Sequence, residues 1–247
     1  MTPWHENDAL WAELLPVLDS EAFRKDASGH AQQASALMKV APGARLLDLG
    51  CGPGRHSVAL ARLGYRVTGV DRNTTYLARA KDRASEAGVQ PDFVQDSMIR
   101  FRREAAFDGA INLFSTFGYF EDRADDVQVM RNLCASLKPG ARAVVDLAGK
   151  EFLAGHYATK DWHALGGGRF WLESREVLPG WERLRVQWTF VGGGEPRDFV
   201  VEIRVYSGAE LREVMLQAGF AEVELLGGLD GRPYNRESAR LVAVGRK

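Results

Sequence analysis

The sequence has few of the features that would place it in several large classes of protein. It contains only two cysteines, Cys51 and Cys134, which form neither a disulfide framework nor a cysteine-based metal pattern. Its five histidines are scattered, with no pair four residues apart, so we expect no metal site. Its formal net charge is only −1, which gives no basic footprint for binding nucleic acid.

Long apolar runs are missing as well. No run reaches the roughly 18 apolar residues that a membrane-spanning helix needs, so we expect no membrane partner. The first residues lack a basic segment followed by an apolar one, which is the pattern of a secretory signal. Cytoplasmic residence is therefore the default expectation. There is no internal repeat, and 247 residues suffice for one large α/β domain.

The most informative segment of the chain is residues 46–54, which read LLDLGCGPG. The apolar run is typical of a buried parallel strand, and the glycines allow the backbone to turn tightly and to approach a ligand closely. Pro53 stands where a helix can begin, because its missing N–H would be unpaired there anyway. A strand, a bare loop and a helix N-terminus together predict a cradle for a cofactor.

Two kinds of cofactor compete for this loop. The dinucleotide fingerprint places its third glycine three positions after the second, whereas here the third glycine is Gly54 and Arg55 follows it. Asp48 lies two residues before the first glycine, where a carboxylate would repel a pyrophosphate but suits a cofactor with a cationic amino group. The segment resembles motif I of class I methyltransferases, which use S-adenosylmethionine (SAM). An NAD-dependent oxidoreductase is the disfavoured alternative.

Four further segments follow the pattern of the same family in the same order. They are residues 65–71, 93–98, 107–113 and 137–146, each of which reads as a strand or as a turn leading into one. The first two carry an acid at or near the end of the strand, Asp71 and Asp96. An acid such as Asp71 at the tip of the second strand can accept hydrogen bonds from both ribose hydroxyls of an adenosine.

The resemblance implies a SAM site. In the family pattern Asp96 accepts a hydrogen bond from the adenine amino group, and the residues that follow it flank the ring. The methionine carboxylate of SAM needs a cation, for which Arg24 and Arg55 are the candidates. The residues that we assign to the cofactor are Asp48, Gly50, Cys51, Gly52, Gly54, Asp71, Arg72, Asp96, Ser97, Met98, Asn112, Leu113 and Arg24. We interpret Cys51 as a small residue tolerated in the loop rather than as a nucleophile.

Strands that alternate with helices over residues 43–148 predict a parallel sheet with right-handed crossovers. With two strands near the C-terminus, the last of them antiparallel, the expected fold is a seven-stranded, mostly parallel, Rossmann-like α/β sheet with helices on both faces. We expect a single domain over residues 1–247. Helices are predicted over residues 8–15, 20–40, 53–63, 74–87 and 124–137, and in a segment that opens with a capping box at Ser207.

Two segments lie outside the minimal fold, an N-terminal helical cap over residues 1–40 and an insertion over about residues 165–206. In the insertion, three runs with β character predict an antiparallel unit after the fifth strand. Four of the six tryptophans lie in or near the insertion, and the other two lie near the N-terminus. Both segments could form a lid over the open ends of the strands, the aromatic residues could simply pack the insertion onto the body, or the insertion could be a homodimer surface.

Residues 112–120, NLFSTFGYF, resemble the segment after motif IV in methyltransferases that act on small molecules, among them the sugar-amine and the glycine/sarcosine types. The resemblance implies transfer of a methyl group from SAM to an N or O atom of a small molecule. Tyr119 is the candidate for orienting the acceptor, and the candidates for a base are His156, Tyr157 and His163. The alternatives are packing or surface roles for these residues, and, for the protein, binding of SAM without turnover as a sensor or scaffold.

Overall fold

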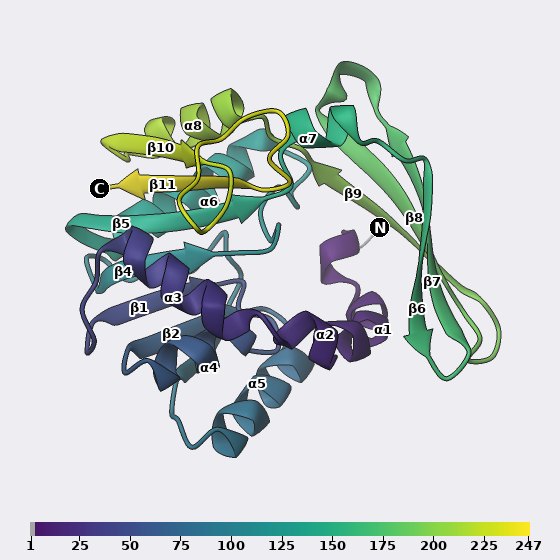
Figure 1. The fold of residues 1–247 in the computed structure, drawn as a ribbon, viewed down its shortest axis with the longest axis horizontal. Helices are drawn as coiled ribbons and strands as arrows, with labels where there is room; N and C mark the ends of the chain where they lie inside the picture. Colours follow the sequence, from purple (N-terminus) through teal and green to yellow (C-terminus); the bar gives the residue numbers. More distant parts are fainter. Residues whose placement is uncertain (1–2) are drawn as a thin grey trace.

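Two β-sheets lie side by side in the computed structural model, which describes residues 3–247 (Figure 1). The strands of the larger sheet are β1 (Arg45–Leu49), β2 (Arg66–Asp71), β3 (Asp92–Gln95), β4 (Phe107–Asn112), β5 (Leu137–Leu147), β10 (Glu222–Leu226) and β11 (Leu241–Arg246). Their order is β10-β11-β5-β4-β1-β2-β3. The strands β1 to β5 run parallel, and β11 runs antiparallel to both of its neighbours. The predicted seven-stranded, mostly parallel sheet is confirmed.

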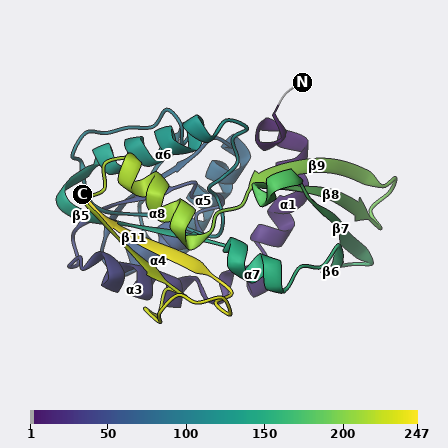
Figure 2. The ribbon, with the colours of Figure 1, turned by 90° about the horizontal axis from the view of Figure 1, so that it is seen from above.

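Helices cover both faces of this sheet (Figure 2). The helices α3 (Ala27–Met38) and α4 (Arg55–Arg62) pack on one face, whereas α6 (Arg123–Ser136) and α8 (Gly208–Gln217) pack on the other. The remaining helices are α1 (Asp8–Leu18), α2 (Glu21–Arg24), α5 (Thr74–Glu86), α7 (Lys150–Gly155) and the short 3-10 turns η1 (Trp4–Glu6) and η2 (Pro179–Trp181). The predicted capping box is present at the start of α8, where Ser207 and Glu210 cap each other's backbone N–H groups.

The N-terminal helices differ from the prediction in two places. Helix α1 continues through Pro16 to Leu18 instead of ending before the proline, because a proline near the end of a helix removes only one backbone hydrogen bond. The single helix expected over residues 20–40 is divided into α2 and α3. The reason is that the carbonyl of Phe23, which would accept a bond from the next turn, accepts one from the Arg55 guanidinium instead.

The smaller sheet is antiparallel and has four strands rather than the three that we expected. They are β6 (Lys160–Gly166), β7 (Arg169–Val177), β8 (Arg183–Val191) and β9 (Arg197–Arg204). The extra strand β6 is almost wholly exposed, so it lacks the strict alternation of apolar and polar residues that identifies a half-buried strand. Among residues 3–247, no helix has the length and apolar composition required to cross a membrane.

Helix α1 packs on the inner face of the smaller sheet, between the two sheets (Figure 1). Its Leu10 and Leu14 are buried against Phe190 and Val201. Glu13 of α1 is also buried and forms ion pairs with Arg169 of β7 and with Arg197 of β9. A buried carboxylate is tolerated here because it is paired with two guanidinium groups. The helix is thus fixed to the smaller sheet by apolar and ionic contacts together.

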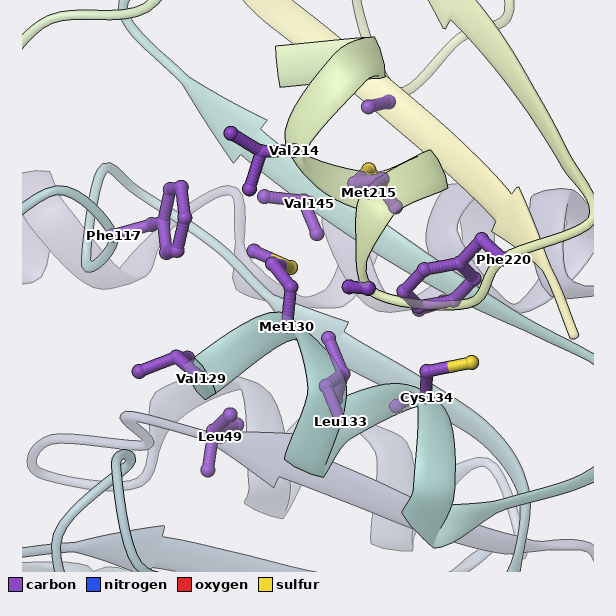
Figure 3. Close-up of a cluster of buried hydrophobic side chains, with 14 of the residues drawn as sticks. Leu49, Phe117, Val129, Met130, Leu133, Cys134, Val145, Val214, Met215 and Phe220 are labelled. Atoms are coloured by element: carbon purple, nitrogen blue, oxygen red, sulfur yellow. The ribbon is translucent and has the colours of Figure 1, made fainter. Parts of the chain in front are cut away.

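The main core lies between β5 and the helices α6 and α8 (Figure 3). Met130 and Leu133 of α6 point toward Val145 of β5, and Val214 and Met215 of α8 close the cluster from above. These side chains are almost completely shielded from solvent. Burial of this size is the main source of stability for the sheet that carries the cavity described below.

The substitution Leu133→Ala should therefore lower the free energy of unfolding by about 2–5 kcal/mol, because it leaves a cavity in this core. The matched control is Leu216→Ala in the neighbouring helix α8, where the side chain is 45% exposed and the expected loss is within about 0.5 kcal/mol. Urea denaturation followed by circular dichroism measures both values. Equal losses for the two variants would contradict the assignment of this cluster as the main core.

Candidate functional site

A cavity of about 360 Å³ opens at the carboxyl ends of the parallel strands, between the two sheets. The carboxyl edge is where open α/β sheets bind their ligands, because the loops that follow the strands converge there. The lining comes from the loops after β1, β2, β3 and β4, from residues of the N-terminal segment between 4 and 23, and from the inner face of the smaller sheet. Its size is that of a small-molecule site.

The glycine loop after β1 forms the floor of the cavity. The backbone N–H groups of Gly50 and Cys51 both donate to the carbonyl of Val70, at 2.8 and 2.9 Å, so the loop is tied to the end of β2. Gly50 has a φ of +74°, and a Cβ atom there would lie 3.1 Å from the Thr116 hydroxyl oxygen. A side chain at this position would be strained and would intrude on the loop after β4. The loop therefore presents bare backbone to the cavity.

Asp71, at the tip of β2, orders this part of the site. One of its carboxylate oxygens accepts a hydrogen bond from the Gly52 N–H at 2.8 Å, and the other accepts one from the Asn73 N–H at 2.9 Å. Burial raises the pKa of the Asp71 carboxyl, and these backbone bonds oppose the rise. Each oxygen can accept more than one hydrogen bond, so the carboxylate can still bind a ligand in the cavity that it lines.

Asp48 lies beneath the loop rather than in the cavity wall. Its side chain is buried, and the Ser57 hydroxyl donates to it at 2.6 Å. Burial raises the pKa of Asp48 to about 6, although the bond from Ser57 stabilises the charged form. The carboxylate thus connects β1 to the start of α4, on the two sides of the glycine loop.

Aromatic side chains form the opposite wall of the cavity. Tyr119 packs against two tryptophans of the N-terminal segment that also contact each other, with ring centroids 4.7 Å from Trp4 and 6.3 Å from Trp11. Trp171 and Trp188 of the smaller sheet line the same cavity and meet edge to face at 5.1 Å. The Tyr119 hydroxyl has no hydrogen-bond partner among the residues that the structure describes. Burial raises the pKa of this hydroxyl, which therefore stays protonated at neutral pH.

The N-terminal segment is hydrogen-bonded to both walls. The Trp4 indole N–H donates to the Glu202 carbonyl in β9 at 2.8 Å. On the other side, the Tyr76 hydroxyl of α5 donates to the Trp11 carbonyl at 2.8 Å, and the Arg72 guanidinium donates to the His5 carbonyl at 3.1 Å. The segment therefore spans the gap between the glycine-loop side and the smaller sheet.

Comparison with known proteins identifies the part of the chain that carries the glycine loop. Residues 46–140 match the family model described as "Methyltransferase domain". This segment is a class I methyltransferase domain. The ubiquinone biosynthesis O-methyltransferase of Marinobacter nauticus is 33% identical over 103 residues, which are 42% of this chain and 43% of that protein. The match thus spans less than half of the length of this curated relative.

Solved structures share the fold over nearly the whole chain. The CcbJ methyltransferase of Streptomyces caelestis superposes with a TM-score of 0.75 at 23% identity, over 90% of this chain and 94% of that one. CalS10 of Micromonospora echinaspora, described as an amino pentose methyltransferase with SAM bound, gives a TM-score of 0.67 at 21% identity, over 96% of each chain. The likeness therefore extends beyond the methyltransferase domain to the N-terminal helices and the smaller sheet.

The methyltransferase domain supplies most of the site residues expected from the sequence. Those that line the cavity are Gly50, Cys51, Gly52, Asp71, Arg72, Ser97, Met98, Leu113 and Tyr119. Four others do not line it. Asp48 and Gly54 flank the loop from below, the Asn112 amide donates to the Leu49 carbonyl at 2.8 Å, and Asp96 accepts from the Ser97 N–H at 2.7 Å. Their contacts in this structure are with the chain around the cavity, and their assignment to the cofactor stays a prediction.

Arg24 and His156 do not reach the cavity of the methyltransferase domain. Arg24 is exposed and donates to the Asp19 carbonyl at 2.7 Å, whereas its neighbour Phe23 in α2 is the residue that lines the cavity. His156 is exposed and stacks on Phe152 at 4.1 Å, since α7 carries the chain away from the strand ends. Tyr157, the second candidate for a base, donates its hydroxyl to the Arg175 carbonyl.

The arginine that does line the cavity is Arg55, the other candidate from the sequence. Its guanidinium lies over the rings of both Phe23 and Phe114, 4.3 and 3.9 Å from their centroids. Burial lowers the pKa of Arg55 to about 10, so the group remains charged at neutral pH. Stacking on two rings fixes the direction of the guanidinium, which supports a role in binding an anionic group.

Several cavity residues were not assigned to the site from the sequence, among them two histidines. His5 of η1 lines the cavity beside Phe120, with ring centroids 5.1 Å apart. Burial lowers the pKa of His5, so its ring is neutral at pH 7. His56, in the first turn of α4, is buried, and its Nε2 has no hydrogen-bond partner within residues 3–247. The position of His56, two residues after Gly54, could have indicated that it lies near the glycine loop. Nothing around His5 in the sequence indicates that it lines the cavity.

No group of three or more His, Cys, Asp or Glu side chains among residues 3–247 could hold a metal ion. Both cysteines are free and buried, Cys51 in the loop and Cys134 in α6. Burial raises the pKa of the Cys51 thiol well above its usual range, so the thiol is protonated and weakly nucleophilic. A reaction without a metal remains a prediction.

The raised pKa of Asp48 leads to a test of the buried carboxylate. Because its folded-state pKa is near 6 and its unfolded value near 3.8, folding favours the protonated form, and stability falls as the pH rises through this window. Wild type should therefore lose about 2 kcal/mol relative to Asp48→Asn between about pH 4 and pH 7. Urea denaturation of both proteins across this range measures the difference.

The control is Asp108→Asn. The neighbouring Lys138 holds the pKa of Asp108 below its usual value, although partial burial opposes it, so wild type should gain stability relative to this variant as the pH rises. If the difference in free energy of unfolding between wild type and Asp48→Asn does not change from pH 4 to 7, the burial of a carboxylate under the loop is contradicted.

Proposed function

We propose that this protein transfers the methyl group of SAM to an N or O atom of a small molecule. The observation that carries the proposal is that the glycine loop with Asp71 and the aromatic wall with Tyr119 border one and the same cavity. One side has the features of a nucleoside cradle, and the other offers a separate surface for an acceptor. The names of the relatives, and the SAM bound in the CalS10 structure, support this assignment.

The residues on the cradle side fit the parts of SAM. We assign the ribose hydroxyls to Asp71, whose carboxylate lies at the tip of β2 and faces the cavity. Ser97, Met98 and Leu113 follow β3 and β4 and provide backbone and apolar contacts for the adenine ring. We assign the methionine carboxylate to Arg55, because it is the stacked, charged guanidinium next to the loop. Gly50 has no Cβ, which leaves room for the ligand to lie against the backbone.

The chemistry requires little of the protein beyond orientation, exclusion of water and removal of a proton. When bound, SAM supplies a methyl group that its sulfonium already activates. The Tyr119 hydroxyl stays protonated and faces the cavity, so it can donate to or accept from the nucleophile and fix its direction. His5 is neutral at pH 7 and can accept a proton from the acceptor, if the acceptor carries one that must leave.

We further propose that η1, α1 and the smaller sheet act together as a lid. Trp4, Trp11, Trp171 and Trp188 all line the cavity, whereas Trp162 and Trp181 are on the outside, 62% and 38% exposed. Four inward tryptophans on two segments far apart in the sequence favour a lid over mere packing of the insertion. Such a lid keeps water from the reacting atoms and selects the acceptor.

Asp71→Ala should weaken SAM binding by about 1–3 kcal/mol, because ribose hydroxyls would lose their acceptor in a buried site. Isothermal titration calorimetry with SAM measures the affinity. Asp92→Ala, which removes an exposed acid at the other end of the neighbouring strand β3, serves as control and should bind as wild type does. Unchanged affinity in Asp71→Ala would refute the ribose assignment, and stabilisation by NAD but not by SAM in a thermal-shift assay would refute the proposed function.

Tyr119→Phe should lower turnover with little change in SAM affinity, because the hydroxyl is assigned to the acceptor. The acceptor used is whichever compound of a library gives release of S-adenosylhomocysteine. Tyr157→Phe is the matched control, since its hydroxyl is bonded to the Arg175 carbonyl outside the cavity. Equal turnover of Tyr119→Phe and wild type would show that Tyr119 is a packing residue.

A further inference from the structure

Apolar and aromatic side chains line almost all of the part of the cavity that we assign to the acceptor. If SAM takes the glycine loop, Asp71 and Arg55, as proposed above, the space that remains is bordered by the N-terminal segment and the smaller sheet. The side chains that line this part are Trp4, Trp11, Leu14, Tyr119, Phe120, Trp171, Trp188, Val201 and Ile203. Val201 and Ile203 alternate along β9 and so lie on the same face of the sheet.

The polar atoms of these tryptophans do not face the cavity. The indole N–H of Trp4 is bonded to the Glu202 carbonyl, and that of Trp11 is bonded to the His5 carbonyl at 2.8 Å. The indole nitrogens of Trp171 and Trp188 are buried and reach no hydrogen-bond partner among the residues that the structure describes. All four rings therefore offer carbon edges and faces to a ligand.

The charged groups nearest to this wall are occupied by other contacts. Arg72 donates to the carbonyls of His5 and Glu6 and forms an ion pair with Asp8 at 3.1 Å. Glu13 is paired with arginines of the smaller sheet. The hydroxyls of Ser115 and Thr116, which also line the cavity, are bonded to backbone groups. On this side of the cavity, the polar groups left for an acceptor are the Tyr119 hydroxyl and the ring of His5. Both lie beside aromatic rings, and neither is an ion at neutral pH.

This wall disfavours an acceptor with many hydroxyl groups or a carboxylate. Each hydroxyl of a sugar that leaves water without a new partner costs free energy, and a buried unpaired charge costs more. A planar aromatic molecule, by contrast, gains from burial and from stacked or edge-to-face contacts with the tryptophans. A single hydroxyl or amino substituent would find Tyr119 and His5 as its partners.

We infer that the acceptor is a flat aromatic molecule bearing a nucleophilic hydroxyl or amino group, held between the N-terminal tryptophans and those of the smaller sheet. This inference rests on the proposed function. In the reaction, the oxygen or nitrogen lone pair forms a bond to the methyl carbon as the carbon–sulfur bond breaks. The electron pair of that bond stays on sulfur, which gives S-adenosylhomocysteine. The proton of the nucleophile leaves to His5 or to solvent.

The test compares simple probes on the full chain. The probes are 2-naphthol and 2-naphthylamine as flat aromatic acceptors and glucosamine as a polyhydroxylated amine. Calorimetry with S-adenosylhomocysteine-saturated protein measures probe binding, and release of S-adenosylhomocysteine from SAM measures turnover. We expect a naphthyl probe to bind and to be methylated, and glucosamine to do neither. Methylation of glucosamine in preference to both naphthyl probes would overturn the inference while leaving the proposed function intact.

Tryptophan variants test where the naphthyl probe binds. Trp171→Ala and Trp188→Ala should weaken naphthyl binding at least about tenfold, because each removes an aromatic wall. Trp188→Phe, which keeps a ring and guards against loss of folding, should stay within about threefold of wild type. Trp162→Ala, on the exposed outer side of the smaller sheet, should change binding by less than about twofold. SAM affinity is measured in every variant, and an unchanged value shows that the cofactor half of the cavity is intact.

The two proposals fail in different ways. Wild-type protein that does not bind SAM would overturn the proposed function. The aromatic acceptor site alone would be overturned by a different result. In that case the wild-type protein binds SAM, but the naphthyl probes bind equally well to Trp171→Ala, Trp188→Ala and Trp162→Ala.

Discussion

The site depends on one physical constraint, which is that the N-terminal segment must be bonded to both sides of the cavity at once. Trp4 is held by a backbone carbonyl of β9, while the carbonyls of His5 and Trp11 are held by Arg72 and Tyr76 of the methyltransferase domain. Each such hydrogen bond contributes only about 1 kcal/mol. These hydrogen bonds matter mainly for geometry, because they fix where the aromatic rings lie relative to the glycine loop. The larger stabilisation comes from the apolar face of α1 against the smaller sheet.

The loop after β4 is held from the same side. The Arg204 backbone N–H donates to the Gly118 carbonyl at 2.7 Å, and the Arg183 guanidinium donates to the Phe120 carbonyl at 2.8 Å. Gly118 has a φ of +90°, and a Cβ atom there would lie 2.5 Å from the Arg204 carbonyl oxygen. Tyr119 is therefore placed by the smaller sheet as much as by the domain that contains it.

The cofactor half was predictable because its signals are local. The spacing of the glycines, the acid at the tip of β2 and the strand–helix alternation are all contained in short windows of sequence, and the alternation indicates a mostly parallel sheet. The rest depends on contacts between distant residues. The break between α2 and α3 arises because Arg55 takes the Phe23 carbonyl, and His5 enters the cavity because Arg72 binds its backbone. The strand β6 pairs with β7 despite an exposed surface that carries no apolar pattern.

The bond between Trp4 and Glu202 joins residues that are 198 positions apart in the chain. On a ribosome, Trp4 emerges long before Glu202 has been made, and residues 46–140 are made in between. The last part of the larger sheet, with α8, β10 and β11, is made only after Glu202. N-terminal units generally fold first during synthesis, and long loops close late because closure costs entropy. The bond that fixes Trp4 can therefore form only after about four fifths of the chain has been made. Until β9 exists, Trp4 of a nascent chain lacks its hydrogen-bond partner, and the N-terminal segment cannot yet be bonded to both sides of the cavity.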